Sequence, residues 1–496
     1  MKITKIILWL LIISYTVFFS YLSIKRYRTL NSHYYDLGIM NQTVYNTSQG
    51  HFLEMTDQTL KKNISRLAVH FDPILAAFAP FYKIYPGAET LLIGQTVIVA
   101  LGALAVYLLA EKILKKEWLS LLFSVLYLLY FPVSRANLFD FHAVVLATTF
   151  FLFAIYFYLS KKKFLFFFFV LLSLLTKEHV GLVVAFLGVY IFIFKKDKKT
   201  GLTTFLLGMV FFIATVYFII PYFRQQTHFA LRYFQDFGDS PTLVVFNLVR
   251  YPLYTIRYFF HPDVYTYLFR LFSPMFYSLF SPFTLLIALP ELAINVFSLN
   301  SNMRAIFFHY NAIIVPFVFY SSILGYKFLD ERIKSKLLKN SILVLFIFSN
   351  LYSVYLYSPL PLKFLKDPLV LRKQTSLKLK TVEDWEEKLK DPSIKVATTP
   401  ILAPYFTERE YYYNFLFDPA YASMGYTDED VTATSENVYK MAEYVIIDRA
   451  EIGRLSKGTL AVKFYQNFLT DRNYRMIFSD DQGADSIEVY QRVSNL

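Results

Sequence analysis

The chain has 496 residues, of which 56% are hydrophobic and 19% aromatic, and its mean hydropathy of +0.40 is high for a soluble protein. It has no cysteine, which excludes disulfides, cysteine metal ligands and a cysteine nucleophile. The net charge is +13, and much of the lysine lies in short loops between apolar runs. This pattern indicates membrane topology and contact with anionic lipid headgroups, and not a nucleic-acid partner.

Long runs without a charged residue recur along the chain and predict helices that cross a membrane. Each is near the roughly 20 residues needed to span a hydrocarbon core. The runs are residues 6–24, 90–110, 201–223 and 340–362. The first is long for the apolar part of a signal peptide and ends at Lys25 and Arg26 without a small-residue cleavage site. We therefore expect it to remain as the first transmembrane helix.

The apolar pattern predicts a polytopic α-helical membrane protein with about eleven transmembrane helices. In chain order they are residues 6–24, 88–110, 118–132, 141–160, 164–176, 180–194, 201–223, 264–281, 283–297, 306–326 and 341–358. Under this assignment all lysine clusters fall on one side of the membrane. The clusters are residues 112–116, 161–163, 195–199 and 327–339. The positive-inside rule then places them and the N-terminus in the cytoplasm and the C-terminal part outside the cytoplasmic membrane.

Two outer segments and a soluble domain complete the predicted organisation. The first outer loop covers about residues 25–87. The second, about 224–263, mixes aromatics with arginines, which suits helices lying in the membrane interface. Residues 1–358 form the predicted transmembrane domain. Residues 359–496, where charges become frequent, form a small extracytoplasmic α/β domain.

The expected elements of the soluble domain follow from its short apolar runs. We predict an amphipathic helix capped by Thr381 and a second helix over residues 457–469. The strands are predicted at residues 394–398, 411–415, 444–447, 474–478 and 487–491.

Ionisable residues from six separate places in the chain fall near the outer ends of the predicted helices or in the outer loops. Such groups are costly at membrane depth, so they tend to be paired and functional. They are Asp36, His70, Asp72, Asp140, His142, Lys177, Glu178, His179, Arg304 and His309. Their convergence on one leaflet predicts an outer-leaflet cavity.

Asp36, about a dozen residues after the first helix, has two interpretations. Its carboxylate can accept a proton from a hydroxyl or hold a divalent cation such as Mg²⁺ or Mn²⁺. Alternatively, it caps a helix. Asp72 before Pro73 also suits a helix cap, whereas His70 is less easily explained by structure alone, although a single histidine is most often just hydrogen-bonded.

Lys177, Glu178 and His179 lie between two short apolar segments, where three ionisable residues are not expected to face lipid. The lysine can neutralise a phosphate with Glu178 orienting it, or the three can form a solvated turn.

The remaining candidates are weaker individually. Asp140 and His142 flank Phe141 at the start of the fourth predicted helix, where Asp140 can serve as a cap. His309 begins the tenth predicted helix, with Arg304 just before it. No glycine-rich phosphate loop or nucleophile elbow is present.

Several longer motifs contain the candidate residues. They include Tyr35-Asp-Leu-Gly-Ile-Met-Asn-Gln, Val69-His-Phe-Asp-Pro-Ile-Leu, Asn137-Leu-Phe-Asp-Phe-His, Leu175-Thr-Lys-Glu-His, Leu289-Pro-Glu-Leu-Ala-Ile-Asn and His309-Tyr-Asn-Ala-Ile-Ile-Val-Pro-Phe. These motifs resemble a prokaryotic membrane-protein family of unknown function, numbered two thousand and seventy-nine. The soluble domain matches through Ala442-Glu-Tyr-Val-Ile-Ile-Asp, so the resemblance spans nearly the whole chain. His179 stands where the resemblance leads us to expect an acidic residue.

That family in turn resembles the integral membrane glycosyltransferases of the C-type (GT-C) fold in its layout. The resemblance implies transfer of a sugar from a polyprenyl-phosphate carrier with inversion of the anomeric centre. Asp36 matches the position of their catalytic carboxylate. The Asp-x-Asp pair of some members is absent here, so the resemblance leaves metal dependence open. The implied partners are a polyprenyl-phosphate-linked sugar, a glycan, lipid or protein acceptor, and membrane lipids.

The leading hypothesis is therefore a GT-C glycosyltransferase with Asp36 as general base. His70, Lys177, Glu178, His179, Arg304 and His309 would bind the phosphate or substrate, and Asp72, Asp140 and His142 would shape the pocket or hold a cation. A lipid or glycolipid transporter is the alternative, because the prolines at 274, 282 and 290 would interrupt helices as in transporter substrate sites. A non-catalytic scaffold or receptor is the third hypothesis, and it predicts that Asp36→Asn leaves function unchanged.

Overall fold

The computed structural model describes residues 3–225, 229–360, 374–416, 435, 438–454 and 458–493. These residues divide into two compact units. The helical unit contains Met1–Ser23, Leu67–Ile74 and Ile93–Lys366, and the α/β unit contains Ile24–Arg66, Leu75–Leu92 and Asp367–Leu496. The first outer loop thus belongs largely to the same unit as the C-terminal part of the chain. The division into a transmembrane domain and an extracytoplasmic domain at residue 359 stays a prediction.

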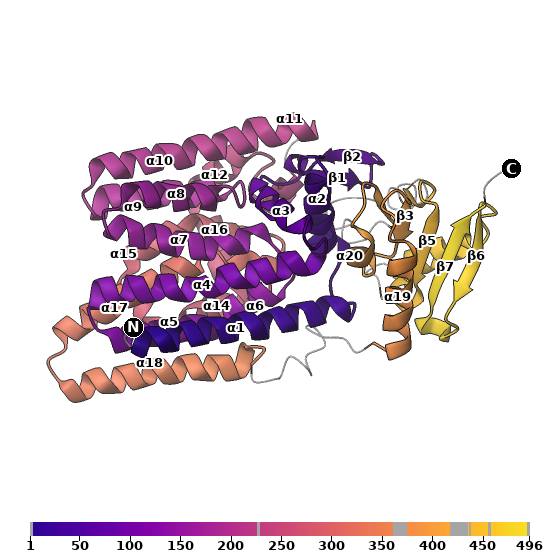
Figure 1. Ribbon diagram of the computed structural model, residues 1–496. Coiled ribbons are helices and arrows are strands. Elements are labelled where there is room, and N and C mark those ends of the chain that lie inside the picture. The colour runs from indigo at the N-terminus through magenta and orange to yellow at the C-terminus, as the bar shows by residue number, and fades with distance from the viewer. Residues whose placement is uncertain are drawn as a thin grey trace. The chain divides into compact units, whose positions relative to one another are not determined.

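Apolar helices dominate the first 360 residues (Figure 1). The longer ones are α1 (Ile3–Arg28), α4 (Ala88–Leu114), α5 (Glu117–Leu129), α7 (Ala143–Leu159), α8 (Lys163–Leu174), α9 (Val180–Phe194), α10 (Lys198–Ile213), α12 (Pro241–Arg250), α14 (Pro262–Phe272), α17 (Val315–Arg332) and α18 (Lys336–Tyr357). The shorter ones are α2 (Ile39–Ser48), α3 (Ala79–Tyr82), α6 (Phe131–Leu138), α11 (Ile220–Arg224), α13 (Pro252–Phe259), α15 (Pro282–Leu285) and α16 (Leu289–Phe297).

Four helical stretches in the described chain are long and apolar enough to cross a membrane: Ile3–Arg28, Ala88–Leu114, Lys198–Arg224 and Lys336–Tyr357. The α5–α6 pair adds a fifth if its 43° bend is taken as one broken span. Several shorter apolar helices, among them α7, α8 and α9, have 10–17 residues. The structure therefore confirms a mostly helical chain with several apolar helices, and the number of eleven spans stays a prediction.

Three of the predicted helices are wrong in their extent, and a proline accounts for each difference. The third segment is divided because Pro132 lies in the first turn of a new helix, α6. The eighth ends at Phe272, shortly before Pro274, and continues only as a 3-10 turn, η6 (Phe276–Phe280). The tenth begins at Val315, nine residues late, because Pro316 occupies the first turn of α17 and lacks the N–H that an earlier start would require.

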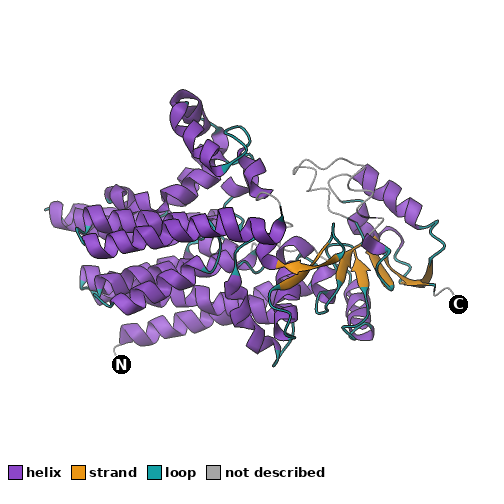
Figure 2. Cartoon of the chain, turned by 90° about the horizontal axis from the view of Figure 1, so that it is seen from above, coloured by secondary structure: helices purple, strands orange, loops and turns teal. Residues whose placement is uncertain are grey.

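The α/β unit contains a five-stranded sheet in the order β4-β3-β5-β7-β6. Figure 2 draws the strands in orange. Its strands are β3 (Val396–Thr398), β4 (Tyr412–Asn414), β5 (Tyr444–Asp448), β6 (Tyr474–Ser479) and β7 (Ile487–Arg492). Strands β3, β4 and β5 are parallel, and β7 pairs antiparallel with β5 and β6. All five predicted strand positions are present.

Helices α19 (Ser376–Lys388) and α23 (Gly458–Phe468) accompany this sheet, together with short helices α20 (Ala403–Phe406) and α22 (Arg449–Ile452). The prediction that Thr381 caps the first of them is wrong. The helix starts earlier, because the Thr375 hydroxyl accepts the N–H of Lys378 at 3.2 Å and so caps it.

The first outer loop is ordered by its own secondary structure. It contains a π-helical turn, η1 (Tyr34–Gly38), then α2, and a hairpin of β1 (Glu54–Asp57) and β2 (Lys62–Ser65). These elements bring Asp36 into the α/β unit.

Candidate functional site

Five of the predicted site residues come together in the helical unit, in what we call the polar cluster: His70, His142, Lys177, His179 and His309. The His309 imidazole interacts electrostatically with the other four side chains. These five residues come from separate places in the sequence. His70 precedes the 3-10 helix η3 (Pro73–Phe78), His142 precedes α7, Lys177 and His179 lie in the turn between α8 and α9, and His309 begins the 3-10 turn η9 (His309–Asn311).

Glu178 ties the His70 loop to the α8–α9 turn. Its Oε1 lies 3.0 Å from Nδ1 of His70, and its Oε2 accepts the backbone N–H of Phe71 at 3.0 Å. Glu178 is 5% exposed, so its charge must be balanced locally. Both carboxylate oxygens are thereby engaged with the His70 segment, which fixes the imidazole that faces His309.

Lys177 is half-buried and makes no hydrogen bond or ion pair with any residue that the structure describes. The other four residues of the polar cluster are histidines, and two of them, His70 and His179, have carboxylate partners. His179 Nε2, next along the turn, lies 3.1 Å from Oε2 of Glu291, a buried residue of α16. An ammonium group held without an acidic partner beside several imidazoles is suited to binding an anion.

His142 and His309 stack on one another, with ring centroids 3.7 Å apart and an interplanar angle of 20°. The backbone N–H of His142 donates to Oε1 of Gln95 at 2.8 Å, and its Nδ1 lies 3.1 Å from the carbonyl oxygen of Phe139. Asp140, two residues before His142, adopts a positive φ of 51° and is buried, in a tight link between α6 and α7. The stack and these bonds hold the two imidazoles in place.

Arg304 has a structural task in the described conformation. Its Nη1 donates to the carbonyl oxygens of Asn295 and Val296 at 3.3 Å each, and to that of Ser298. These carbonyls lie at the C-terminal end of α16, where a helix leaves acceptors unpaired. Its guanidinium therefore stabilises the end of the helix that carries Glu291.

Asp36 belongs to the α/β unit, whereas Asp72 belongs to the helical unit and follows His70 by two residues. Asp36 is the third residue of the η1 turn, whose N-cap is His33, and α2 is preceded by Gly38, so Asp36 caps neither element. Its carboxylate is partly exposed. Asp72 is 3% exposed and immediately precedes Pro73 at the start of η3, as expected for a residue that begins a helix.

The described residues contain no group of three or more His, Asp or Glu side chains placed to hold a metal ion. The cation expected from Asp36, Asp72, Asp140 and His142 stays a prediction.

Three buried polar residues of the elements that carry or adjoin the site were not singled out from the sequence: Glu291 and Asn295 of α16, and Asn311 of η9. All are fully or almost fully buried in the helical unit. Glu291 and Asn295 lie inside a predicted transmembrane helix, so the cost of polar groups at membrane depth would have identified them. Asn311 follows the already chosen His309 by two residues.

No curated protein matches the chain. Among solved structures, the archaeal oligosaccharyltransferase AglB from Archaeoglobus fulgidus, in complex with an inhibitory peptide and a dolichol-phosphate, is similar at 11% sequence identity and a TM-score of 0.48. The match covers 97% of this chain and 74% of that one. A similarity of this size establishes no activity for this chain. Residues 26–481 match the family model DUF2079, described as a predicted membrane protein, and the chain therefore belongs to that family.

Proposed function

We propose that this protein is a GT-C-type membrane glycosyltransferase that moves a sugar from a polyprenyl-phosphate donor to an extracytoplasmic glycan, lipid or protein acceptor. The observation that carries the proposal is the polar cluster. It places Lys177, without an acidic partner among the described residues, beside four histidines in a unit of apolar helices. A lipid-linked phosphate needs this combination of a cationic site and an apolar surface for its tail.

In the proposed reaction the acceptor oxygen attacks the anomeric carbon from the face opposite the phosphate. A general base takes the proton of the acceptor hydroxyl as that carbon–oxygen bond forms, and Asp36 is the residue that we propose for this role. The bond between the anomeric carbon and the phosphate oxygen breaks, and the polyprenyl phosphate leaves with the electron pair. Lys177, with His309, stabilises the charge on the departing phosphate. Arg304, which holds the end of α16, would act on the site through Glu291.

The proposed topology follows from the lysine clusters. The N-terminus and the lysine-rich loops would face the cytoplasm, and the acceptor would approach from outside the cytoplasmic membrane.

The test is glycosyl transfer from a radiolabelled pool of polyprenyl-phosphate sugars in membranes that contain the wild type or a variant at equal levels. Asp36→Asn should reduce transfer by about 100-fold or more, the usual contribution of a general base. Lys177→Met should reduce transfer by about 10- to 100-fold, since it removes one charge-assisted contact. Lys163→Met is the matched control, because this exposed lysine begins α8, the helix that Lys177 follows.

Each result has a distinct meaning. Transfer that survives in Asp36→Asn would move the base to Asp72 or Glu178. Equal losses in Lys177→Met and Lys163→Met would contradict a phosphate site at Lys177. Absence of transfer by the wild type with several donors and acceptors would favour a lipid or glycolipid transporter.

A further inference from the structure

Four buried polar atoms of Asn295, His309 and Asn311 lack a hydrogen-bond partner among the residues that the structure describes. They are Nδ1 of His309, Oδ1 of Asn295, and both the Nδ2 and Oδ1 atoms of Asn311. Both asparagines are 0% exposed. Buried polar atoms are almost always hydrogen-bonded, because an unpaired one costs about 1–3 kcal/mol. A group of them in one place indicates that their partners are supplied by something other than the protein.

These atoms belong to two elements that touch. Asn295 lies one helical turn after Glu291 on α16, so the two side chains share a face of that helix. The Nδ2 atom of Asn295 donates to the carbonyl oxygen of Tyr310 at 3.1 Å, in the middle of η9. Residues His309 and Asn311 flank that carbonyl. The unpaired atoms thus belong to α16 and η9, which this hydrogen bond joins, and the His309 imidazole interacts electrostatically with Lys177.

The backbone here is irregular. The sequence predicts a regular helix from residue 306, but residues 306–314 form no α-helix and contain the 3-10 turn η9 ahead of α17, which begins at Val315. In membrane proteins, non-helical backbone among apolar helices is tolerated where it is buried in protein or lines a cavity for substrate.

We propose that Asn295, His309 and Asn311 form a subsite for the hydroxyl groups of an uncharged sugar, the sugar of the lipid-phosphate donor. This deepens, and rests on, the function proposed above. The unpaired atoms are amide and imidazole groups that include a donor and acceptors. A sugar hydroxyl both donates and accepts, so it can satisfy such a mixture, whereas a second phosphate would be an acceptor only. The phosphate would bind at Lys177 and the sugar beside it, between α16 and η9.

The test measures binding to the full-length protein purified in detergent, using citronellyl phosphate and its glucose, galactose, mannose, N-acetylglucosamine and glucuronate derivatives. At least one neutral sugar derivative should bind more tightly than citronellyl phosphate itself. The Asn311→Leu substitution should weaken binding of the preferred sugar derivative about tenfold, which corresponds to the loss of one or two neutral hydrogen bonds. The affinity for citronellyl phosphate should stay unchanged.

Asn311→Leu should also fold normally, because the amide it removes has no protein partner in the described structure. The matched control is Asn137→Leu. Asn137 is equally buried but exchanges hydrogen bonds with Thr96 at 3.2 and 3.3 Å, so its replacement should lower thermal stability.

The outcomes separate this inference from the proposed function. If no sugar derivative binds more tightly than citronellyl phosphate, or if Asn311→Leu retains the full preference, the sugar subsite is overturned while the phosphate site stands. Tightest binding of the glucuronate derivative would overturn the assignment to an uncharged sugar. Failure of every compound to bind, citronellyl phosphate included, would contradict the proposed function itself.

Discussion

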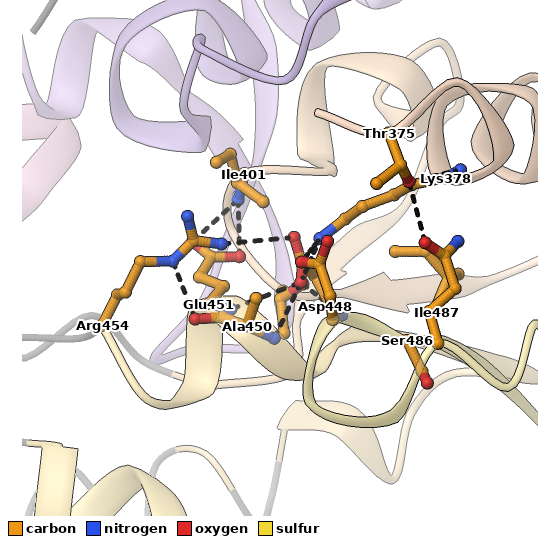
Figure 3. A network of polar contacts seen from close by, with 12 residues as sticks. Thr375, Lys378, Ile401, Asp448, Ala450, Glu451, Arg454, Ser486 and Ile487 are labelled. Carbon is orange, nitrogen blue, oxygen red and sulfur yellow. Dashed lines mark hydrogen bonds and ion pairs between the residues drawn. The ribbon is translucent and has the colours of Figure 1, made fainter. Parts of the chain in front are cut away.

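At the scale of single residues, Lys378 is a fully buried cation of the α/β unit that forms ion pairs with two carboxylates. Its ammonium lies 2.8 Å from a carboxylate oxygen of Asp448 and 2.8 Å from one of Asp485, and neither Lys378 nor Asp448 is exposed (Figure 3). Burial raises the pKa of Asp448, and Lys378 opposes that shift. The ion pair connects α19 to the end of β5, where Asp448 also caps α22.

Lys378→Met should destabilise the protein by about 3–5 kcal/mol, because it removes the nearer cation from the buried Asp448 and leaves Arg454 at 3.9 Å. The measurement is the heat-denaturation midpoint of the full chain in detergent. Lys390→Met, which removes an exposed lysine paired with the exposed Glu387, is the control and should have little effect. Equal midpoints for the two variants would show that Lys378 contributes no more than a surface ion pair.

Glu408 gives a second prediction at this scale. Burial, then the neighbouring carboxylates Glu386 and Glu89, raise its pKa from 4.5 to about 7, while Asn41 and Arg28 lower it. Since the folded state holds a proton that the unfolded state releases, stability should fall as pH rises from about 4.5 to about 7 and change no further above it. The loss is at most about 3 kcal/mol.

Glu408→Gln should remove this pH dependence and raise the denaturation midpoint at pH 8 relative to wild type. Midpoints measured from pH 4.5 to pH 8 test it. Parallel curves for the two proteins would refute the assignment to Glu408.

At the scale of elements, the first outer loop is held by the strands of the C-terminal part. Gln58 carries much of this contact. Its Oε1 accepts the N–H of Asn414 at 2.8 Å, and its Nε2 donates to the carbonyl of Tyr412 at 3.2 Å and to the hydroxyl of Tyr34 at 2.8 Å. The N–H of Tyr34 in turn donates to the carbonyl oxygen of Pro400 at 3.0 Å. Because Tyr34 begins the η1 turn, these bonds position the segment that carries Asp36.

Gln58→Leu should loosen that segment, since it leaves the buried N–H of Asn414 without its acceptor at a cost of about 1–3 kcal/mol. Hydrogen–deuterium exchange of residues 33–48 should become faster. Gln49→Leu, at an exposed position just after α2, is the control. Unchanged exchange in Gln58→Leu would mean that η1 keeps its conformation without the strands.

Helix packing in the helical unit depends on small residues. A Cβ atom at Gly188 of α9 would lie 2.3 Å from the backbone nitrogen of Phe205 in α10, and one at Gly208 would lie 2.4 Å from that of Ala185. The two helices therefore approach backbone to backbone, as small residues permit in membranes.

At the scale of the whole molecule, the lysine clusters predict which side of the membrane each part faces. The chain has no cysteine, so single cysteines can report topology without background. A membrane-impermeant maleimide applied to intact cells should label Asn467→Cys in α23. It should label Lys196→Cys, in the loop before α10, only after permeabilisation. Both positions are exposed. The reverse pattern would invert the topology and place the acceptor side in the cytoplasm.

The sequence by itself determined the class of the molecule and most of its elements. Charge-free runs require burial in lipid or protein, so α1, α4, α9 and α18 could be located from composition alone, and alternating apolar residues located β3 to β7. The predicted helix bounds were wrong near Pro132, Pro274 and Pro316, because a proline limits where a helix can begin or end.

Only the tertiary structure decided the partners of the charged residues. The sequence placed Glu178 beside Lys177, but the fold directs its carboxylate to His70, and it pairs His179 with the overlooked Glu291. It also assigned the first outer loop to the unit that contains the C-terminal sheet. These contacts join residues far apart in the chain, and local pattern carries no information about which distant segment satisfies a buried polar group.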